Sequence, residues 1–97
     1  MNTSEFEWDE NKNLQNEIKH GVSFEEARFA FFDERRILAE DVEHRKSEKR
    51  YFCFGKNRDG TGILTVRFTF RREIIRIIGA GHWRKGRKVY EQENSLQ

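Results

Sequence analysis

The chain has one cysteine, no proline and no hydrophobic run long enough to cross a membrane as a helix. Since Cys53 has no second cysteine to pair with, it cannot form an internal disulfide, and a disulfide-stapled secreted domain is excluded. The first ten residues, MNTSEFEWDE, are acidic and lack the basic start and apolar stretch of a signal peptide. We therefore expect a cytoplasmic protein that makes no membrane contact.

Hydrophobic residues make up only 35% of the 97 residues, but 13% are aromatic and nine residues are phenylalanine. Large rings bury much area per residue, so a small set of them can still build one core. A chain of this length buries roughly 60–65% of the surface of its unfolded state. We expect one domain over residues 1–97, with an almost entirely ionic surface because 37% of the residues are charged.

The net charge of +2 hides an asymmetry between the two halves of the chain. Residues 1–48 carry seven Lys and Arg against thirteen Asp and Glu, and residues 49–97 carry twelve against four. Residues 67–88 hold eight basic residues against Glu73 alone. Such a cluster is typical of a surface that binds a polyanion, usually nucleic acid. The alternative, which is commoner in small domains, is that the acidic half folds against the basic half and neutralises it.

Two helices are predicted near the N-terminus. A short strand is expected at residues 5–8, and Asp9 then stands at the N-cap of a helix that Gly21 ends. Ser23 and Glu26 form a capping box that begins a second, short helix. One side of this helix is apolar, which predicts the burial of Phe24, Ala27, Phe31 and Phe32.

From residue 36 the hydrophobic period changes from that of a helix to that of a strand. Strands are expected at residues 36–41, 50–56, 63–70 and 74–78. The Asp-Gly of NRDGTG predicts one hairpin turn, and residues 71–73 predict a second. A last helix is expected from Trp83 to about Glu93. This order predicts an α+β fold, with two N-terminal helices, a three- to four-stranded antiparallel sheet, helices on one face, and a C-terminal helix.

The last two strands place arginines on the exposed face of the sheet. Their alternation predicts a core-facing set of Leu64, Val66, Phe68, Phe70, Ile75 and Ile77. If Phe70 pairs with Glu73, Arg67 falls opposite Arg76. Because like charges directly opposite each other are destabilising, we expect an anion between them. It is either a phosphate, which guanidinium groups bind through paired hydrogen bonds, or a carboxylate of the acidic half, for example Glu48 or Glu25.

No metal site and no cofactor are predicted. The spacing of the three histidines and of Cys53 matches no zinc pattern, and the glycines fit turns rather than a phosphate-binding loop. A lone histidine is more often a surface residue than a catalyst. The remaining His, Glu, Lys and Arg residues meet the needs of a ribonuclease. The 2′-hydroxyl of RNA supplies the nucleophile, and the protein supplies a base, an acid and cations.

In residues 6–27, FEWDENKNLQNEIKHGVSFEEA, a Phe-x-Trp-Asp start leads to Lys-His-Gly-Val-Ser-Phe-Glu-Glu-Ala. This segment closely resembles the start of the BrnT family of type II toxin–antitoxin ribonuclease toxins. The segment RREIIRIIGAGHWRKGRKVYE is similar to its Arg…Ile-Arg-Ile-Ile segment and its terminal Tyr-Glu helix. The resemblance covers about residues 5–91. Between these segments, five residues fall at family positions: Asp33, His44, Glu48, Arg50 and Gly55.

The resemblance implies a RelE-like toxin fold, RNA cleavage that blocks translation, and neutralisation by a small BrnA-like antitoxin with a ribbon-helix-helix part. Operator DNA would then be bound only through the antitoxin. Carried over by position, His20 or Glu48 is the implied acid–base residue, and Arg71 and Arg76 complete the implied catalytic set. The implied RNA- and phosphate-binding residues are Lys19 and Arg50. Arg67 is a candidate from the strand register alone.

The chain departs from the family pattern after Ile78. Many members carry Ser-Ala-Arg-Lys there, whereas this chain has Gly79-Ala80-Gly81-His82. The arginine expected near Gly81 is missing, and Arg84 and Lys85 are the candidates to replace it in binding RNA. If that arginine is required for cleavage, the protein is a weak or inactive nuclease that still binds its antitoxin. The alternatives are a non-catalytic module that binds RNA through its basic face and one that docks an acidic protein segment there.

Overall fold

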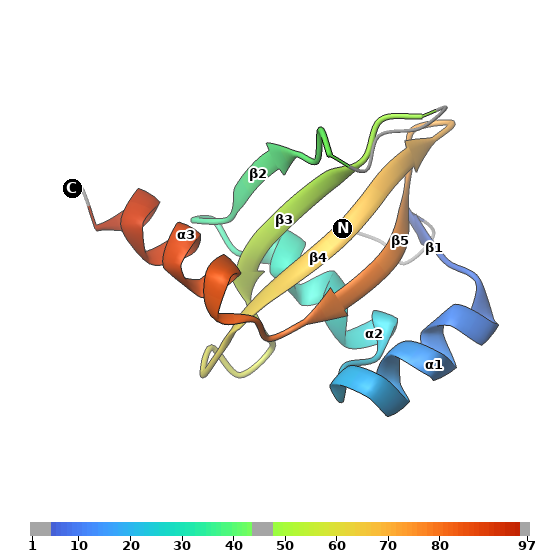
Figure 1. Cartoon of the computed structure of the whole chain (residues 1–97), viewed down its shortest axis with the longest axis horizontal. Helices are drawn as coiled ribbons and strands as arrows, with labels where there is room; N and C mark the ends of the chain where they lie inside the picture. Colours follow the sequence, from blue (N-terminus) through green and yellow to red (C-terminus); the bar gives the residue numbers. More distant parts are fainter. Residues whose placement is uncertain (1–4, 44–47, 96–97) are drawn as a thin grey trace.

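The computed structural model describes residues 5–43 and 48–95 and confirms the α+β class (Figure 1). The chain begins with a short strand, β1 (Phe6–Glu7), and three helical segments, α1 (Glu10–His20), α2 (Phe24–Ala27) and the 3-10 helix η2 (Arg28–Phe32). Then follow β2 (Ile37–Glu40), β3 (Tyr51–Lys56), β4 (Ile63–Arg71), β5 (Ile74–Gly81) and α3 (Arg84–Asn94). Four strands and the last helix therefore lie close to their predicted ranges.

The sheet has five strands in the order β1-β5-β4-β3-β2. Strands β2 to β5 are antiparallel to their neighbours, but β1 runs parallel to β5, with Phe6 beside Ile75 and Glu7 beside Arg76. The expectation of a purely antiparallel sheet of three or four strands is therefore wrong in this detail. The physical reason is that the N-terminal strand β1, which is only two residues long, pairs with the edge of β5 in the parallel direction.

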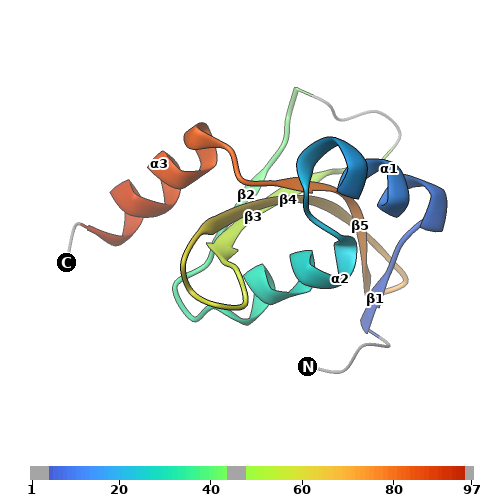
Figure 2. The same cartoon turned by 90° about the horizontal axis from the view of Figure 1, so that it is seen from below.

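Helices lie on both faces of the sheet, contrary to the prediction that they share one. Figure 2 shows α2 on one side, and α1 and α3 on the other. On this second side Gly86 of α3 lies directly over Thr65 of β4, and α1 lies against the C-terminal part of β5. The part of this side between α1 and α3 carries no helix (Figures 1 and 2), and we call it the open face.

The core lies between the sheet and α2 with η2. Phe31 packs edge-on against Phe6 and Phe68, with ring centroids 5.4 Å and 5.0 Å apart. Of the predicted core-facing set, all but one are buried: Leu64, Val66, Phe68, Ile75 and Ile77. Phe70 is 51% exposed, and Phe32 of the helix is also exposed. The burial prediction fails for these two because η2 ends at Phe32 and no helix covers the hairpin end of β4.

The pairing of β4 with β5 differs from the prediction. The turn residues are Arg72 and Glu73, both with positive φ (54° and 68°), so Arg71 pairs with Ile74. The shift by two residues keeps the predicted alternation but moves Arg76 opposite Thr69. An irregularity at the position of Arg67 and Phe68 then places Arg67 opposite a glycine, Gly79. The prediction that Arg67 and Arg76 are cross-strand neighbours is therefore wrong, although both arginines lie on the open face.

Helix α1 is capped as predicted but packs through its polar side. The Asp9 carboxylate accepts hydrogen bonds from the first helical N–H groups, and Gly21 ends the helix with φ 72°. Leu14 and Ile18 share a face, and that face points to solvent, where they are 49% and 84% exposed. The side toward the rest of the fold carries two asparagines. The Asn13 amide oxygen accepts the Phe24 N–H at 2.7 Å.

Asn16 fixes α1 to the edge of β5, beyond the short strand β1. Its amide nitrogen donates to the carbonyls of Val22 and Ala80, both at 2.9 Å, and its amide oxygen accepts the Ala80 N–H at 3.2 Å. One side chain thus binds both backbone groups of Ala80, as a neighbouring strand would. The C-terminal turn of α1 is thereby held beside the open face.

We predict that Asn16→Asp lowers the free energy of unfolding by about 2–4 kcal/mol, because it leaves two carbonyls without a donor and adds a repelling charge. Urea unfolding at neutral pH measures this. Asn11→Asp is the control, since Asn11 is an exposed asparagine on the same helix. Equal unfolding midpoints for the two variants would show that Asn16 does not hold α1.

Candidate functional site

Three arginines project from β4 and β5 onto the open face. Residues directly paired across antiparallel strands point to the same side, so Arg76 shares the side of Thr69, and Arg67 and Arg71 share it by alternation along β4. Phe52 of β3 pairs with Arg67 and extends this side toward β2. The open face is therefore basic along the middle of the sheet, as the charge of residues 67–88 predicts.

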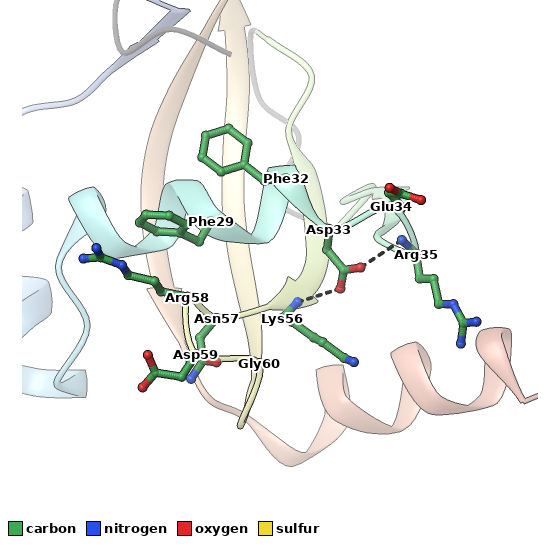
Figure 3. A pocket seen from close by; sticks show the side chains of 10 residues that line it. All are labelled: Phe29, Phe32, Asp33, Glu34, Arg35, Lys56, Asn57, Arg58, Asp59 and Gly60. Atoms are coloured by element: carbon green, nitrogen blue, oxygen red, sulfur yellow. Dashed lines mark hydrogen bonds between the residues drawn. The ribbon is translucent and has the colours of Figure 1, made fainter.

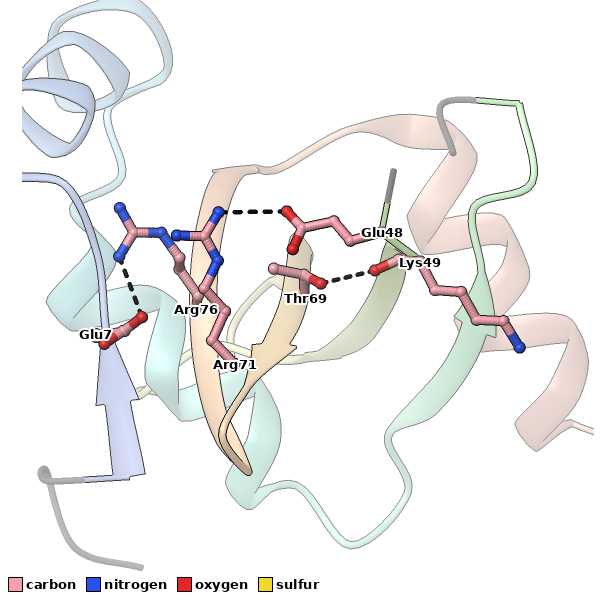
Figure 4. Close-up of polar contacts among 6 residues, drawn as sticks. All are labelled: Glu7, Glu48, Lys49, Thr69, Arg71 and Arg76. Carbon is pink, nitrogen blue, oxygen red and sulfur yellow. Dashed lines mark hydrogen bonds and ion pairs between the residues drawn. The ribbon is translucent and has the colours of Figure 1, made fainter. Parts of the chain in front are cut away.

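Each of these arginines pairs with a carboxylate from the acidic half of the chain. Arg76 Nη1 lies 3.1 Å from Glu7 Oε2, and Arg71 Nη2 lies 3.3 Å from Glu48 Oε1 (Figure 4). Arg67 Nε lies 3.7 Å from Asp41 Oδ2. The anions expected at Arg67 and Arg76 are thus carboxylates here, but they are Asp41 and Glu7 rather than the suggested Glu48 or Glu25. Glu25 instead pairs with Arg28 at 2.6 Å.

The ion pair of Arg67 is the loosest of the three. At 3.7 Å it is too long to be a hydrogen bond, and Arg67 Nε is buried without a hydrogen-bond partner in the described part of the chain. The Arg67 side chain is 30% exposed, whereas that of Asp41 is 5% exposed. A buried N–H that donates to nothing is costly, so the guanidinium of Arg67 is the least well satisfied of the three.

A hollow of about 300 Å³ lies beside Arg67, between α1 and the start of α3. We call it the Arg67 hollow. Its walls are formed by Lys12, Gln15, Asn16, Lys19, His20, Arg67, Ile78, Gly79 and Trp83. The structure therefore brings together three of the predicted site residues: Lys19, His20 and Arg67. Lys12 is not identified from the sequence as a site residue, although its spacing of seven residues from Lys19 places both on one helix face.

His20 and Trp83 close one side of the Arg67 hollow. Their ring centroids lie 5.0 Å apart at 73°. The indole of Trp83 lies over Gly81, where a Cβ would come within 2.6 Å of two ring carbons. Gly81 thus carries no side chain because Trp83 occupies that space. An arginine at this position is incompatible with Trp83 where it stands, which accounts physically for the departure from the family pattern.

The remaining predicted residues lie outside the Arg67 hollow. Glu48 and Arg71 form their pair near the hairpin end of the sheet, where Thr69 Oγ1 also donates to the Lys49 carbonyl at 2.6 Å (Figure 4). Arg76 lies with Glu7 at the β1 edge. Arg50 precedes β3, and its Nε is buried without a hydrogen-bond partner in the described part of the chain.

The two candidate substitutes for the missing arginine lie on the first turn of α3. Arg84 lines a second hollow, of about 350 Å³, with Gly62, Ile63, His82, Trp83 and Arg87. We call it the His82 hollow. Lys85 is exposed and lines neither hollow. His44, which falls at a family position, lies outside the described residues.

The acidic family position at Asp33 has a structural role. Asp33 accepts hydrogen bonds from the N–H groups of Arg35 and Lys56, both at 2.9 Å, and from the Tyr90 hydroxyl at 2.6 Å. Burial alone would raise the pKa of Asp33, but these hydrogen bonds outweigh it and lower the pKa below its usual 3.8. Burial and the Asp33 carboxylate raise the pKa of Tyr90 to about 12. The carboxylate thus joins the end of η2 to β3 and α3.

Asp33 also lines a hollow of about 490 Å³, which Figure 3 shows from close by. Its charged residues are of both signs, among them Glu34, Arg58 and Asp59, and Arg58 lies over the Phe29 ring at 5.5 Å. This mixture favours no single ligand charge. Cys53 is enclosed in the core, where burial raises the pKa of its thiol to about 12, as expected for a packing residue.

Among the described residues, no group of three His, Cys, Asp or Glu side chains is arranged to hold a metal ion. Within the same residues, no helix has the length and apolar character needed to span a membrane.

We predict that Tyr90→Phe lowers the free energy of unfolding by about 1–2 kcal/mol at pH 7, because it removes a hydrogen bond to a charged carboxylate. The folded-state pKa of Asp33 lies below 3.8, so this contribution is present above pH 3.8 and declines as the pH falls further. Urea unfolding at pH 7 and pH 3 measures both effects. Tyr51→Phe, with a ring stacked on Phe68, is the control. A loss that is equal at both pH values would contradict this assignment.

The comparisons with known proteins identify the family of this chain. None of the curated proteins matches the sequence. The family model described as "Ribonuclease toxin, BrnT, of type II toxin-antitoxin system" matches residues 8–86, which include α1 with Lys19 and His20, all of β2 to β5, and Trp83. The match spans well over half of the chain. The protein therefore belongs to the BrnT family of ribonuclease toxins of type II toxin–antitoxin systems.

Proposed function

We propose that this chain is a metal-independent endoribonuclease that cuts RNA at the Arg67 hollow and so blocks translation. The observation that carries the proposal is the gathering of Arg67, Lys12, Lys19 and His20 around one hollow. A guanidinium and two ammonium groups are suited to a phosphodiester, which carries its charge on its oxygens.

The chemistry needs one base, one acid and positive charge. In the proposed step the 2′-oxygen of a ribose attacks the adjacent phosphorus and the bond to the 5′-oxygen breaks, which leaves a cyclic 2′,3′-phosphate and a free 5′-hydroxyl. His20 accepts the proton of the 2′-hydroxyl, and a lysine of the same hollow donates a proton to the leaving oxygen. Arg67 stabilises the charge that develops on the phosphorane oxygens.

The geometry favours His20 over Glu48 as the acid–base residue. Glu48 is paired with Arg71 at 3.3 Å and does not line the Arg67 hollow. Arg71 and Arg76, each held by a carboxylate on the same face, are then positioned to bind phosphates of the RNA on the hairpin side of the cleavage point. Arg50 extends this row toward β3.

The basic open face is also the surface that an antitoxin has to cover to stop cleavage. The BrnT family implies an antitoxin partner, and we propose that it is a BrnA-like ribbon-helix-helix protein which binds operator DNA on behalf of the complex. The site of action is then the cytoplasm, where the RNA substrate is found.

The test is cleavage of RNA by the purified chain in EDTA. We expect new RNA ends with the wild type and a loss of rate of about 100-fold or more in Arg67→Ala and in His20→Ala. Arg58→Ala is the matched control, because Arg58 is an exposed arginine that lies over the Phe29 ring and lines neither the Arg67 hollow nor the His82 hollow. Circular dichroism shows whether each variant is folded.

Two results would contradict the proposal. Full activity of Arg67→Ala would place the reaction elsewhere, and loss of wild-type activity in EDTA would mean that a metal ion is needed. If RNA stays intact with the wild type both alone and with ribosomes present, the chain is a binding module and not an enzyme.

A further inference from the structure

We infer that Trp83 is a stacking platform for one unpaired base of single-stranded RNA, an inference that rests on the proposed function and names its substrate class. Trp83 is 38% exposed although its ring lies over Gly81 and touches His20. A large aromatic side chain that is only partly covered offers apolar area that a base covers well.

Among residues 5–43 and 48–95, Trp83 is the one shared by the walls of the Arg67 hollow and the His82 hollow. Lys12, Lys19 and Arg67 line the first, and His82, Arg84 and Arg87 line the second. The indole is therefore a ridge between two basic hollows. A strand that crosses the ridge places its base on the indole and its two flanking phosphates in the hollows.

This arrangement selects for RNA without base pairs. Basic side chains alone bind single and double strands, since both carry phosphates. An aromatic platform reaches only a base that has left its stack, and base–aromatic stacking tolerates any sequence. We therefore expect preference for unpaired stretches with little preference for one base.

Gly81 leaves the space that the Trp83 ring occupies over β5. A Cβ at residue 81 would collide with the Trp83 ring. Gly81→Ala should therefore push the indole away from β5 and weaken binding of single-stranded RNA, although the positive charge of the protein is unchanged.

Fluorescence tests the inference directly, because the chain has only two tryptophans. Trp8 packs against Phe24 of α2, and Trp8→Phe keeps an aromatic ring there. Because Trp83 is then the remaining tryptophan, the emission of this variant reports on Trp83 alone. The probe is a short single-stranded 2′-O-methyl RNA, which lacks the attacking hydroxyl and is not cut. We expect its binding to quench the emission, whereas heparin, a polyanion without bases, should bind without the same quenching.

Affinity provides the second readout. We expect Trp83→Ala to bind the single-stranded probe about 10- to 100-fold more weakly, while Trp83→Phe restores most of the loss and binding of a double-stranded RNA is unchanged in both. Trp83→Phe also answers the concern that Trp83→Ala is misfolded, because it keeps a ring beside His20.

The outcomes separate the two proposals. If wild-type protein binds no RNA, the proposed function fails, and this inference fails with it. If RNA binds but Trp83→Ala binds the probe as tightly as the wild type does, or the emission is unchanged at saturation, only the role of Trp83 is overturned.

Discussion

The hydrogen bonds from Asn16 to β5 determine where the candidate site is built. This amide binds both backbone groups of Ala80 and the carbonyl of Val22, and it thereby holds the end of α1 against β5. The residue of β5 that faces Asn16 is a glycine, Gly79. The helix contributes little apolar area, so these polar contacts rather than hydrophobic burial fix its position. Lys19 and His20 come to lie beside Arg67 as a consequence, and residues from opposite ends of the sequence form one hollow.

The contacts between the acidic and basic halves of the chain bear on both interpretations of its charge, self-neutralisation and the binding of a polyanion. Carboxylates of the first half do pair with arginines of the second, as expected for a self-neutralising domain. Yet these pairs lie on the one face that has no helix over its middle, and they leave the side chains of Arg67, Arg71 and Arg76 30%, 51% and 26% exposed. In the proposed function, an RNA phosphate meets arginines already held in place, which reduces the entropy lost on binding.

Capping residues and alternation made most of the fold predictable, because Asp9, Gly21 and Ser23 act locally and β3 to β5 each bury one side against η2 and α2. The pairing of β4 with β5 was not predictable in the same way. Turns at residues 71–72 and 72–73 preserve the same alternation, and the turn at 72–73 moves Arg76 from Arg67 to Thr69. In the candidate site, the resemblance points to His20 and Lys19, and the alternation along β4 predicts the exposed side for Arg67, although its predicted pairing with Arg76 is wrong. The contribution of Lys12 and the position of Trp83 over Gly81 depend on tertiary packing that no local pattern encodes.

The central claim is that a phosphate of RNA binds at Arg67, beside α1. Nuclear magnetic resonance of the arginine side-chain N–H groups, during titration with a non-cleavable 2′-O-methyl RNA, tests it most directly. The account predicts that the Arg67 Nε–H signal moves strongly and saturates with the probe, together with signals of His20, while that of Arg58, over the Phe29 ring, moves far less. An Arg67 signal that stays in place when the protein is saturated with RNA would contradict the account.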